Sequence, residues 1–163
     1  MMRYILSSAF LFFVLSGCLK NEATVNPCTY DECALKAPAN EIQDVQTYLN
    51  TSGITNATQH CSGLFYRVAT PGVGKTPVVC STVSAFYTGR FTNGTVFDQT
   101  TTTPANFPLN GVIEGWKKGV PLIKEGGKIF LYIPPTLAYG SSGRSGIPPN
   151  SILIFEIDLQ SVF

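Results

Sequence analysis

The spacing of the apolar residues changes near residue 62 of the chain. Before that point, three apolar residues recur at the spacing of an α-helix: Ile42, Val45 and Leu49. Asn40 is available as an N-cap, and Gly53 lies just beyond the end. The pattern therefore predicts an amphipathic helix over residues 38–53.

After residue 62 the apolar residues mostly alternate with polar ones, which is typical of β-strands. The predicted strands are Leu64–Val68, Val78–Tyr87, Val96–Phe97, a short edge strand around Pro108, Lys128–Pro134 and Ser151–Val162. The Asn93-Gly94 dipeptide predicts a hairpin turn. One segment, Ile113–Ile123, has helical spacing instead. The expected fold class is α+β, with an antiparallel sheet and no second domain.

The first residues have the composition of an export signal. Arg3 supplies a positive charge, and the segment from Tyr4 to Leu15 is almost wholly apolar. This segment is shorter than the roughly 20 residues that a membrane-spanning helix needs. Residues 1–17 are therefore predicted to be a cleaved secretory signal peptide.

The end of that signal, Leu15-Ser16-Gly17-Cys18, resembles a bacterial lipobox. A lipobox would place a lipidated Cys18 at the mature N-terminus, where acyl chains anchor a protein to a membrane. Residues 18–37 would then be a lipid-anchored tether. Leu19 lacks the acidic character associated with inner-membrane retention in some bacteria, which favours the outer membrane, with the domain in the periplasm or at the cell surface. The alternative is an ordinary cleaved signal followed by an incidental cysteine.

Charge and length narrow the possible partners. Without the signal, about 146 of the 163 residues remain, which suits one domain with a tether. The formal charge falls from +1 to about zero, because Arg3 is the only charged residue removed. A neutral chain argues against binding to nucleic acid or to a membrane through a basic patch. No coiled-coil pattern or apolar interface stripe is present, so a monomer is expected.

Four cysteines follow Cys18: Cys28, Cys33, Cys61 and Cys80. An even number in an exported protein predicts disulfides, and the sequence does not decide among the three possible connectivities. We favour Cys28–Cys33, which closes a short loop, with Cys61–Cys80, which lie near corresponding ends of apparently neighbouring strands. A zinc site using His60 is less favoured, because structural zinc sites show close ligand pairs on both halves. No metal is therefore predicted.

Two other patterns resemble catalytic motifs. Residues 69–76 satisfy a loose phosphate-loop pattern, but such a loop needs a helix after its Lys-Thr, and Pro77–Cys80 is predicted to be a strand. Asp98 and Glu114 could be imagined as paired catalytic carboxylates, but Glu114 adjoins a predicted helix start, where negative charge is favourable. We interpret the first pattern as a turn and the second as coincidence.

Four short motifs after residue 90 point to one family. They are Val96-Phe97-Asp98, Val112-Ile113-Glu114-Gly115-Trp116, Ala138-Tyr139-Gly140 and Ile147-Pro148-Pro149. Pro134-Pro135 and Pro148-Pro149 fix the chain direction on both sides of Tyr139, as expected where a side chain is aimed at a site. Together the motifs resemble the FKBP-type peptidyl-prolyl cis-trans isomerases. The resemblance implies a domain over residues 62–163 in which an antiparallel sheet wraps around one short helix.

The resemblance also implies a substrate pocket with aromatic walls. Its predicted residues are Tyr87, Phe97, Asp98, Val112, Ile113, Trp116, Tyr139, Ile147 and Phe155. The predicted catalytic residues among them are Phe97, Asp98, Ile113, Trp116 and Tyr139. Asp98 is expected to be a buried carboxylate that orients Tyr139 or polarises the pocket through hydrogen bonds, and Ile113 to offer its backbone N–H to a substrate carbonyl. For Phe97, Trp116 and Phe155 taken singly, core packing is the alternative role.

Isomerisation of an X–Pro amide needs no nucleophile, metal or cofactor, so no cofactor is expected. Its barrier of ~18–20 kcal/mol arises from amide resonance, which places negative charge on oxygen. A dry aromatic pocket withholds solvation from that charge and so favours the twisted state. The predicted function is a peptidyl-prolyl cis-trans isomerase that assists the folding of exported proteins. Its partners would be proline-containing exported polypeptides, and macrolide-type molecules would be its inhibitors.

Three residues depart from the family pattern. Ala105 stands where many members carry another aromatic residue, so one wall of the pocket looks open. Asn110 replaces the usual glycine before the Val-Ile segment, and Arg144 lies in the flap where substrate preference is partly decided. The open wall motivates an alternative function, a catalytically weak proline-binding chaperone or interaction module on the same fold.

Overall fold

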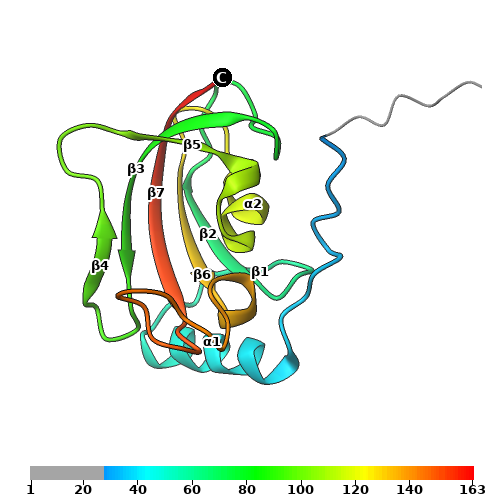
Figure 1. Cartoon of the computed structure of the whole chain (residues 1–163), viewed down its shortest axis with the longest axis vertical. Helices are drawn as coiled ribbons and strands as arrows, with labels where there is room; N and C mark the ends of the chain where they lie inside the picture. Colours follow the sequence, from blue (N-terminus) through cyan, green and yellow to red (C-terminus); the bar gives the residue numbers. More distant parts are fainter. Residues whose placement is uncertain (1–27) are drawn as a thin grey trace, which may run out of the picture.

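The computed structural model describes residues 28–163, and one β-sheet dominates them (Figure 1). Its strands are β1 (Thr58–Gln59), β2 (Phe65–Thr70), β3 (Thr82–Arg90), β4 (Val96–Gln99), β5 (Ala105–Pro108), β6 (Lys128–Ile133) and β7 (Leu153–Val162). The strand order is β1-β2-β6-β7-β3-β4, and β5 also pairs with β3. Every pairing in these residues is antiparallel, so the predicted α+β class with an antiparallel sheet is confirmed.

Short helices accompany the sheet. They are α1 (Ala39–Thr51), α2 (Glu114–Gly119) and the 3-10 helices η1 (Leu109–Gly111), η2 (Val120–Leu122) and η3 (Pro135–Leu137). The helix predicted over residues 113–123 is thus divided between α2 and η2. The division follows from Pro121, which has no N–H and cannot continue the α-helical hydrogen bonds.

The strand predictions differ from the structure mainly at their ends. The hairpin at Asn93-Gly94 is confirmed, since the Gly94 N–H donates to the Phe91 carbonyl at 2.9 Å. The strand predicted from Val78 begins only at Thr82, because residues 78–81 form a turn in which the Ser81 N–H donates to the Val78 carbonyl at 2.8 Å. The segment after residues 69–76 therefore contains no helix in the structure, and a phosphate loop would require one.

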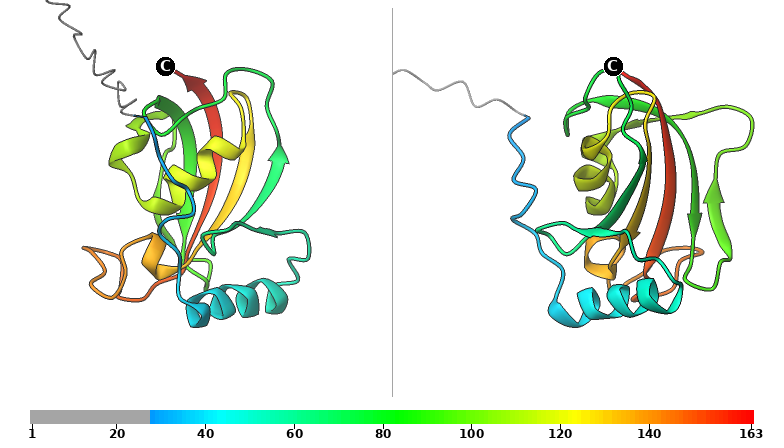
Figure 2. Two further views of the ribbon diagram at one scale, coloured as in Figure 1. Left: turned by 90° about the vertical axis from the view of Figure 1, so that its right-hand side faces the viewer. Right: turned by 180° about the vertical axis from the view of Figure 1, so that it is seen from behind.

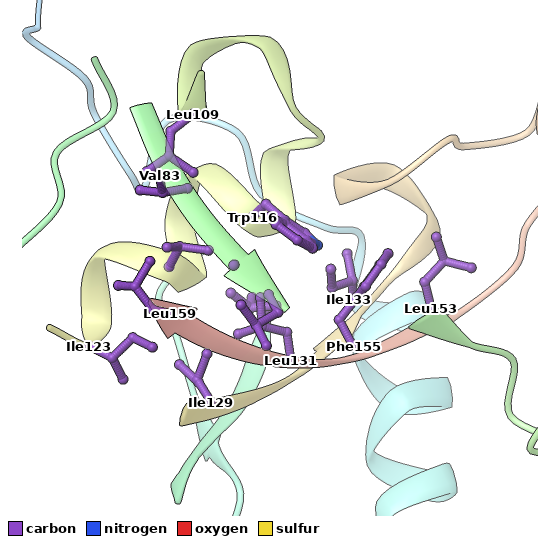
Figure 3. Close-up of a cluster of buried hydrophobic side chains, with 14 of the residues drawn as sticks. Val83, Leu109, Trp116, Ile123, Ile129, Leu131, Ile133, Leu153, Phe155 and Leu159 are labelled. Atoms are coloured by element: carbon purple, nitrogen blue, oxygen red, sulfur yellow. The ribbon is translucent and has the colours of Figure 1, made fainter. Parts of the chain in front are cut away.

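The sheet curls around α2, and the space between them holds the main hydrophobic core (Figures 2 and 3). Alternate residues of β6 and β7 supply its centre: Ile129, Leu131, Ile133, Leu153, Phe155, Ile157 and Leu159. Two glycines let α2 lie close to β6. A Cβ on Gly115 would approach Ile133 Cδ1 to 2.6 Å, and one on Gly119 would approach Leu131 Cδ2 to 2.5 Å. A larger residue at either position would push α2 away from the sheet, and Trp116 with it.

Helix α1 crosses one end of the sheet and covers a second, smaller core (Figures 1 and 2). Val45 and Leu49 of the helix pack there with Phe65 and Tyr132. The helix follows Pro38, which occupies the N-cap position, so the predicted N-cap, Asn40, lies within the first turn. In residues 28–163, no helix has the length and apolar content that crossing a bilayer requires.

The disulfides connect the start of the described chain to both ends of the sheet. Cys28 is bonded to Cys80, and Cys33 to Cys61, with Cα–Cα distances of 5.4 and 5.6 Å. The favoured pairing of Cys28–Cys33 with Cys61–Cys80 is therefore wrong. Cys61 precedes β2 and Cys80 precedes β3, and these strands are not neighbours, because β6 and β7 lie between them. They also run in opposite directions, so their starting ends lie at opposite ends of the sheet.

We call residues 28–51 the N-terminal segment. Before α1 it runs along α2 from one end of the molecule to the other (Figure 2). Near its middle the Ala37 N–H donates to the Ser62 carbonyl at 2.8 Å. The described part of the predicted tether is thus attached to the domain. The predicted signal peptide over residues 1–17, Cys18 and residues 19–27 lie outside the described residues.

Candidate active site

A cavity of about 380 Å³ opens between α2, the β3–β5 side of the sheet and the loop after η3. Seven of the predicted pocket residues line it: Tyr87, Asp98, Val112, Ile113, Trp116, Tyr139 and Phe155. Three further residues that were not predicted to bind substrate also line it: Phe107, Gly111 and Arg144. The volume lies within the range of small-molecule and short-peptide sites.

Trp116 forms the centre of an aromatic cluster at this cavity. The residue is only 4% exposed. Three aromatic rings surround it, and the plane of each is steeply tilted to the plane of the indole. The ring centroids lie 5.4 Å away for Tyr87, 5.3 Å for Phe107 and 5.3 Å for Phe155. Edge-to-face contacts of this kind fix ring orientation as well as burying area. The cavity therefore has a rigid, apolar floor.

Two predicted pocket residues do not line the cavity. Phe97 packs behind Phe155, with ring centroids 5.5 Å apart, and against Phe91 at 4.9 Å. Ile147 is 8% exposed and belongs to the hydrophobic core, because its backbone is paired with Arg144 in a tight turn that directs the side chain inward. Phe97 therefore supports the wall at Phe155, whereas Ile147 is part of the main core.

Phe107 occupies the wall that Ala105 appeared to leave open. It contacts Tyr87 in an edge-to-face pair with centroids 5.6 Å apart. Ala105 and Phe107 are two residues apart on β5, so their side chains face the same side of the sheet. That period-two spacing is the sequence signal from which Phe107 could have been found.

Asp98 is exposed, so the expectation that it is a buried carboxylate is wrong, and within residues 28–163 it makes no hydrogen bond with Tyr139. It lies on the four-residue strand β4, which pairs with β3 alone among the described strands and so forms an edge that leaves the carboxylate open to solvent. Its Oδ2 accepts a hydrogen bond of 2.8 Å from the Tyr87 hydroxyl instead. Burial and this hydrogen bond raise the pKa of Tyr87 to about 12. Tyr87 therefore remains a protonated donor at any physiological pH.

The backbone of Ile113 offers an open hydrogen-bond donor. Its carbonyl accepts from the N–H groups of Trp116 and Lys117 at 3.0 and 3.2 Å, because Ile113 stands at the N-cap position of α2. Within residues 28–163 its own N–H has no hydrogen-bond partner. Ile113 lines the cavity, so this unused donor is a candidate partner for a ligand bound there.

Tyr139 is positioned by a turn that α1 holds in place. The carboxylate of Glu41 accepts hydrogen bonds from the backbone N–H and the hydroxyl of Thr136, at 2.8 and 2.7 Å. Thr136 lies in η3, three residues before Tyr139. The Tyr139 hydroxyl accepts a hydrogen bond of 2.9 Å from Arg144 Nη1. Glu41 is a residue that sequence reasoning missed, because no local pattern connects it to the turn.

The face of α2 opposite Trp116 carries a charged cluster. The Tyr30 hydroxyl donates to Glu114 Oε2 at 2.6 Å and accepts from Lys118 Nζ at 2.7 Å. Burial alone would raise the pKa of Glu114, but hydrogen bonds from Lys117, Tyr30 and Lys118 lower it to about 2. Glu114 is thus an ionised structural group, and it does not form a catalytic pair with Asp98.

A match to a protein-family model shows which family the chain belongs to. Residues 74–160 match the model of the FKBP-type peptidyl-prolyl cis-trans isomerases, which is more than half of the chain. The chain belongs to this family. The resemblance suggested by the sequence motifs is confirmed.

Among its FKBP-type relatives is FkpA of Escherichia coli strain K12, 48% identical over 103 residues that make up 62% of this chain and 38% of FkpA. Mip of Coxiella burnetii is 44% identical over 104 residues, 62% of this chain and 45% of Mip. The crystal structure of a peptidyl-prolyl cis-trans isomerase from Pseudomonas syringae pv. tomato superposes with a TM-score of 0.67 at 32% identity, covering 78% of this chain and 97% of that one. The chain spans about two fifths of the length of the first two relatives.

All residues that line the cavity lie inside the FKBP-type match, which begins at residue 74. Tyr30 and Glu41 lie before it. Cys28, Cys33 and Cys61 are the cysteines that a zinc site at His60 would have used, and all three are in disulfides. The N-terminal segment thus precedes the residues matched by the family model, and it contacts both α2 and the turn before Tyr139.

Proposed function

We propose that this protein is a peptidyl-prolyl cis-trans isomerase that binds X–Pro segments in the aromatic cavity. The observation that carries the proposal is the arrangement around Trp116, where Tyr87, Phe107 and Phe155 form an apolar floor and the polar atoms lie at the rim. Convergent polar groups around an apolar cavity are typical of a binding site. Family membership supports the same conclusion.

The chemistry requires no covalent step. In the planar amide, resonance places negative charge on the oxygen and positive charge on nitrogen. An apolar floor beneath the proline ring would remove water from that dipole and so raise the planar state relative to the twisted state, which is less polar. No proton needs to be removed, and no nucleophile attacks the amide.

The rim would hold the substrate during this rotation. The unused N–H of Ile113 would donate to a substrate carbonyl, and the hydroxyls of Tyr87 and Tyr139 would lie at the mouth. Asp98 would act on the substrate through Tyr87, because its Oδ2 already accepts from that hydroxyl. Phe97 would keep the wall at Phe155 in place from behind.

The proposed substrates are proline-containing exported polypeptides. Two disulfides support an oxidising compartment. Uncatalysed X–Pro isomerisation takes tens of seconds, so an isomerase outside the cytoplasm would remove a slow folding step. Lipid attachment through Cys18 to a bacterial membrane, with the outer membrane favoured, and a monomeric state belong to the same proposal and rest on the sequence alone.

The test is exchange NMR on a short Phe-Pro peptide, with the purified protein in its disulfide-bonded form at substoichiometric concentration. Isomerase activity predicts exchange between the cis and trans signals in the wild type and its loss in Phe107→Ala and Asp98→Ala. Asp44→Ala, an exposed aspartate on α1, is the matched control for Asp98→Ala.

Three results are distinguishable. Exchange that depends on Phe107 and Asp98 supports an isomerase at this cavity. Peptide signals that shift at stoichiometric protein without faster exchange would replace the isomerase with a proline-binding module. If the protein is folded but the peptide signals neither shift nor exchange faster, the cavity is not a site for X–Pro peptides.

A further inference from the structure

Arg144 is held by the backbone at the mouth of the cavity. Its N–H donates to the Ile147 carbonyl at 2.9 Å, and the Ile147 N–H donates back at 2.8 Å, which closes a two-residue turn. Gly143 precedes it with φ +63, and a Cβ there would lie 2.5 Å from the Ile147 carbonyl oxygen. The turn is therefore tightly defined, and the origin of the Arg144 side chain is fixed.

The guanidinium of Arg144 lies over Tyr139. Nη1 donates to the Tyr139 hydroxyl at 2.9 Å, and Cζ lies 5.1 Å from the centre of the ring. The residue is exposed, and it lines the cavity. A guanidinium has five N–H donors, and this is the one hydrogen bond that Arg144 Nη or Nε atoms make within residues 28–163. Most of its donors therefore remain available to a ligand.

The charges at the mouth are arranged asymmetrically. Of the residues that line the cavity, Arg144 is the one cation and Asp98 the one carboxylate. Asp98 lies on β4 and is already hydrogen-bonded to Tyr87. Within the described residues Arg144 forms no ion pair with a carboxylate, unlike Lys117, Lys118 and Lys128, which all do. The flap side of the mouth thus carries the positive charge, and Asp98 is near enough to act on it electrostatically without forming an ion pair.

We propose that Arg144 selects substrates that carry Asp or Glu next to the proline. This inference rests on the proposed isomerase function, and it adds the chemical class of the neighbouring side chain. A carboxylate matches the planar fork of a guanidinium, and one entering at the flap would gain charge-assisted hydrogen bonds while the proline ring occupies the floor at Trp116. The contact with Tyr139 keeps the guanidinium in place, so little of its freedom is lost on binding.

The experiment compares matched peptides in which the only change is a charge. Exchange NMR gives kcat/KM for Ala-Xaa-Pro-Phe and Ala-Ala-Pro-Xaa peptides with Xaa as Glu or Gln, using the full disulfide-bonded chain at pH 7. In the wild type we expect Glu to exceed Gln about threefold in one of the two series, the size of a single exposed ion pair. The ratio should fall towards one at 0.5 M NaCl.

Arg144→Gln should bring the Glu to Gln ratio to about one, while Arg90→Gln, an exposed arginine of β3 outside the cavity lining, should leave it unchanged. The ratio is taken within each variant, so a general loss of rate in Arg144→Gln does not affect it. If the wild type isomerises the Gln and Glu peptides with equal kcat/KM, the proposed role of Arg144 is wrong, while the isomerase function still holds. A preference for Glu that survives in Arg144→Gln would overturn it equally. No exchange on any peptide would instead contradict the proposed function.

Discussion

The cavity and the N-terminal segment are attached to opposite faces of α2 by different kinds of interaction. On one face, Trp116 contacts three aromatic rings, and the polar groups around them are partly open to solvent. On the other face, Tyr30 is hydrogen-bonded to Glu114 and to the buried Lys118. Two disulfides complete the attachment of the segment. The contrast teaches that the contacts that attach the N-terminal segment are separate from the aromatic contacts that shape the site, although Trp116 and Phe155 also belong to the main core.

The disulfides give the largest expected effect on the stability side of this comparison. Replacing both members of Cys28–Cys80 with serine should lower the free energy of unfolding by about 4 kcal/mol, because the bond closes a long loop in the unfolded chain. Replacing Cys33 and Cys61 should have a slightly smaller effect, because their loop is shorter. Urea unfolding measures both changes, and peptide mapping of the wild type tests the pairing.

The same variants test whether the two regions are separate. Activity per folded molecule on the Phe-Pro peptide should stay within about twofold of the wild type, because both disulfides lie outside the cavity lining. A folded Cys28→Ser/Cys80→Ser protein without activity would show that the N-terminal segment shapes the cavity. That result would contradict the independence of the two regions.

Glu114→Gln should lower the free energy of unfolding by about 3 kcal/mol, since it leaves the buried Lys118 without its carboxylate. Glu156→Gln is the matched control. Glu156 pairs with Lys128, but both side chains are more than a third exposed, so the change should be under about 1 kcal/mol. Equal losses in the two variants would contradict the distinction between a buried and an exposed ion pair.

The contribution of Glu114 should also appear in the pH dependence of the free energy of unfolding. The pKa of Glu114 is lowered from its ordinary 4.5 to about 2 in the folded protein, so the folded state binds this proton more weakly than the unfolded state. Its contribution is complete above about pH 5 and is lost as the pH falls towards 2. The free energy of unfolding should therefore fall less between pH 6 and pH 2 in Glu114→Gln than in the wild type, which denaturant unfolding at a series of pH values measures.

Glu41→Ala is the change expected to affect both regions, because Glu41 lies in the N-terminal segment and contacts the turn before Tyr139. It removes two hydrogen bonds to Thr136 and should lower stability by about 1.5 kcal/mol. Because Thr136 lies just before Tyr139, kcat/KM should also fall, by about fivefold. Asp44→Ala, an exposed carboxylate on the same helix, should change neither quantity. Wild-type activity in Glu41→Ala would show that the turn holds its shape without α1.

Tyr87→Phe should have the smallest effect on stability, under about 1 kcal/mol, because its hydrogen bond to Asp98 lies at an exposed edge. A double-mutant cycle with Asp98→Asn measures their coupling in both stability and kcat/KM. If Asp98 acts through Tyr87, the losses of activity in the two single variants should not add. Full additivity would mean that Asp98 acts on the substrate by another contact.

The cavity residues were largely predictable from the sequence because short motifs carry them. Gly115-Trp116 sits on one helical turn, and Ala138-Tyr139-Gly140 follows a Pro-Pro segment, so local geometry already aims these side chains. Phe107 was missed although its spacing from Ala105 on an edge strand would have revealed it. Ile147 was misplaced because only the hydrogen-bonded turn with Arg144 decides which way it points.

Contacts between distant segments could not be predicted in the same way. The disulfide pairing depends on β6 and β7 lying between β2 and β3, and strand order is not visible in the alternation of any one strand. The exposure of Asp98 depends on β4 being an edge strand, which is again a property of the whole sheet. Tyr30 and Glu41 form hydrogen bonds with residues more than 80 positions away in the sequence, so no local pattern predicts their partners.

The bond between Cys28 and Cys80 has a mechanical consequence. Tension applied through the chain that precedes Cys28 would pass across the disulfide to Cys80, two residues before β3. That strand is paired with β7 along most of its length and with β4 and β5 on its other side. The load would therefore enter the fold at its most extensively paired strand, and α1 with the turn before Tyr139 would stay outside the path of the force.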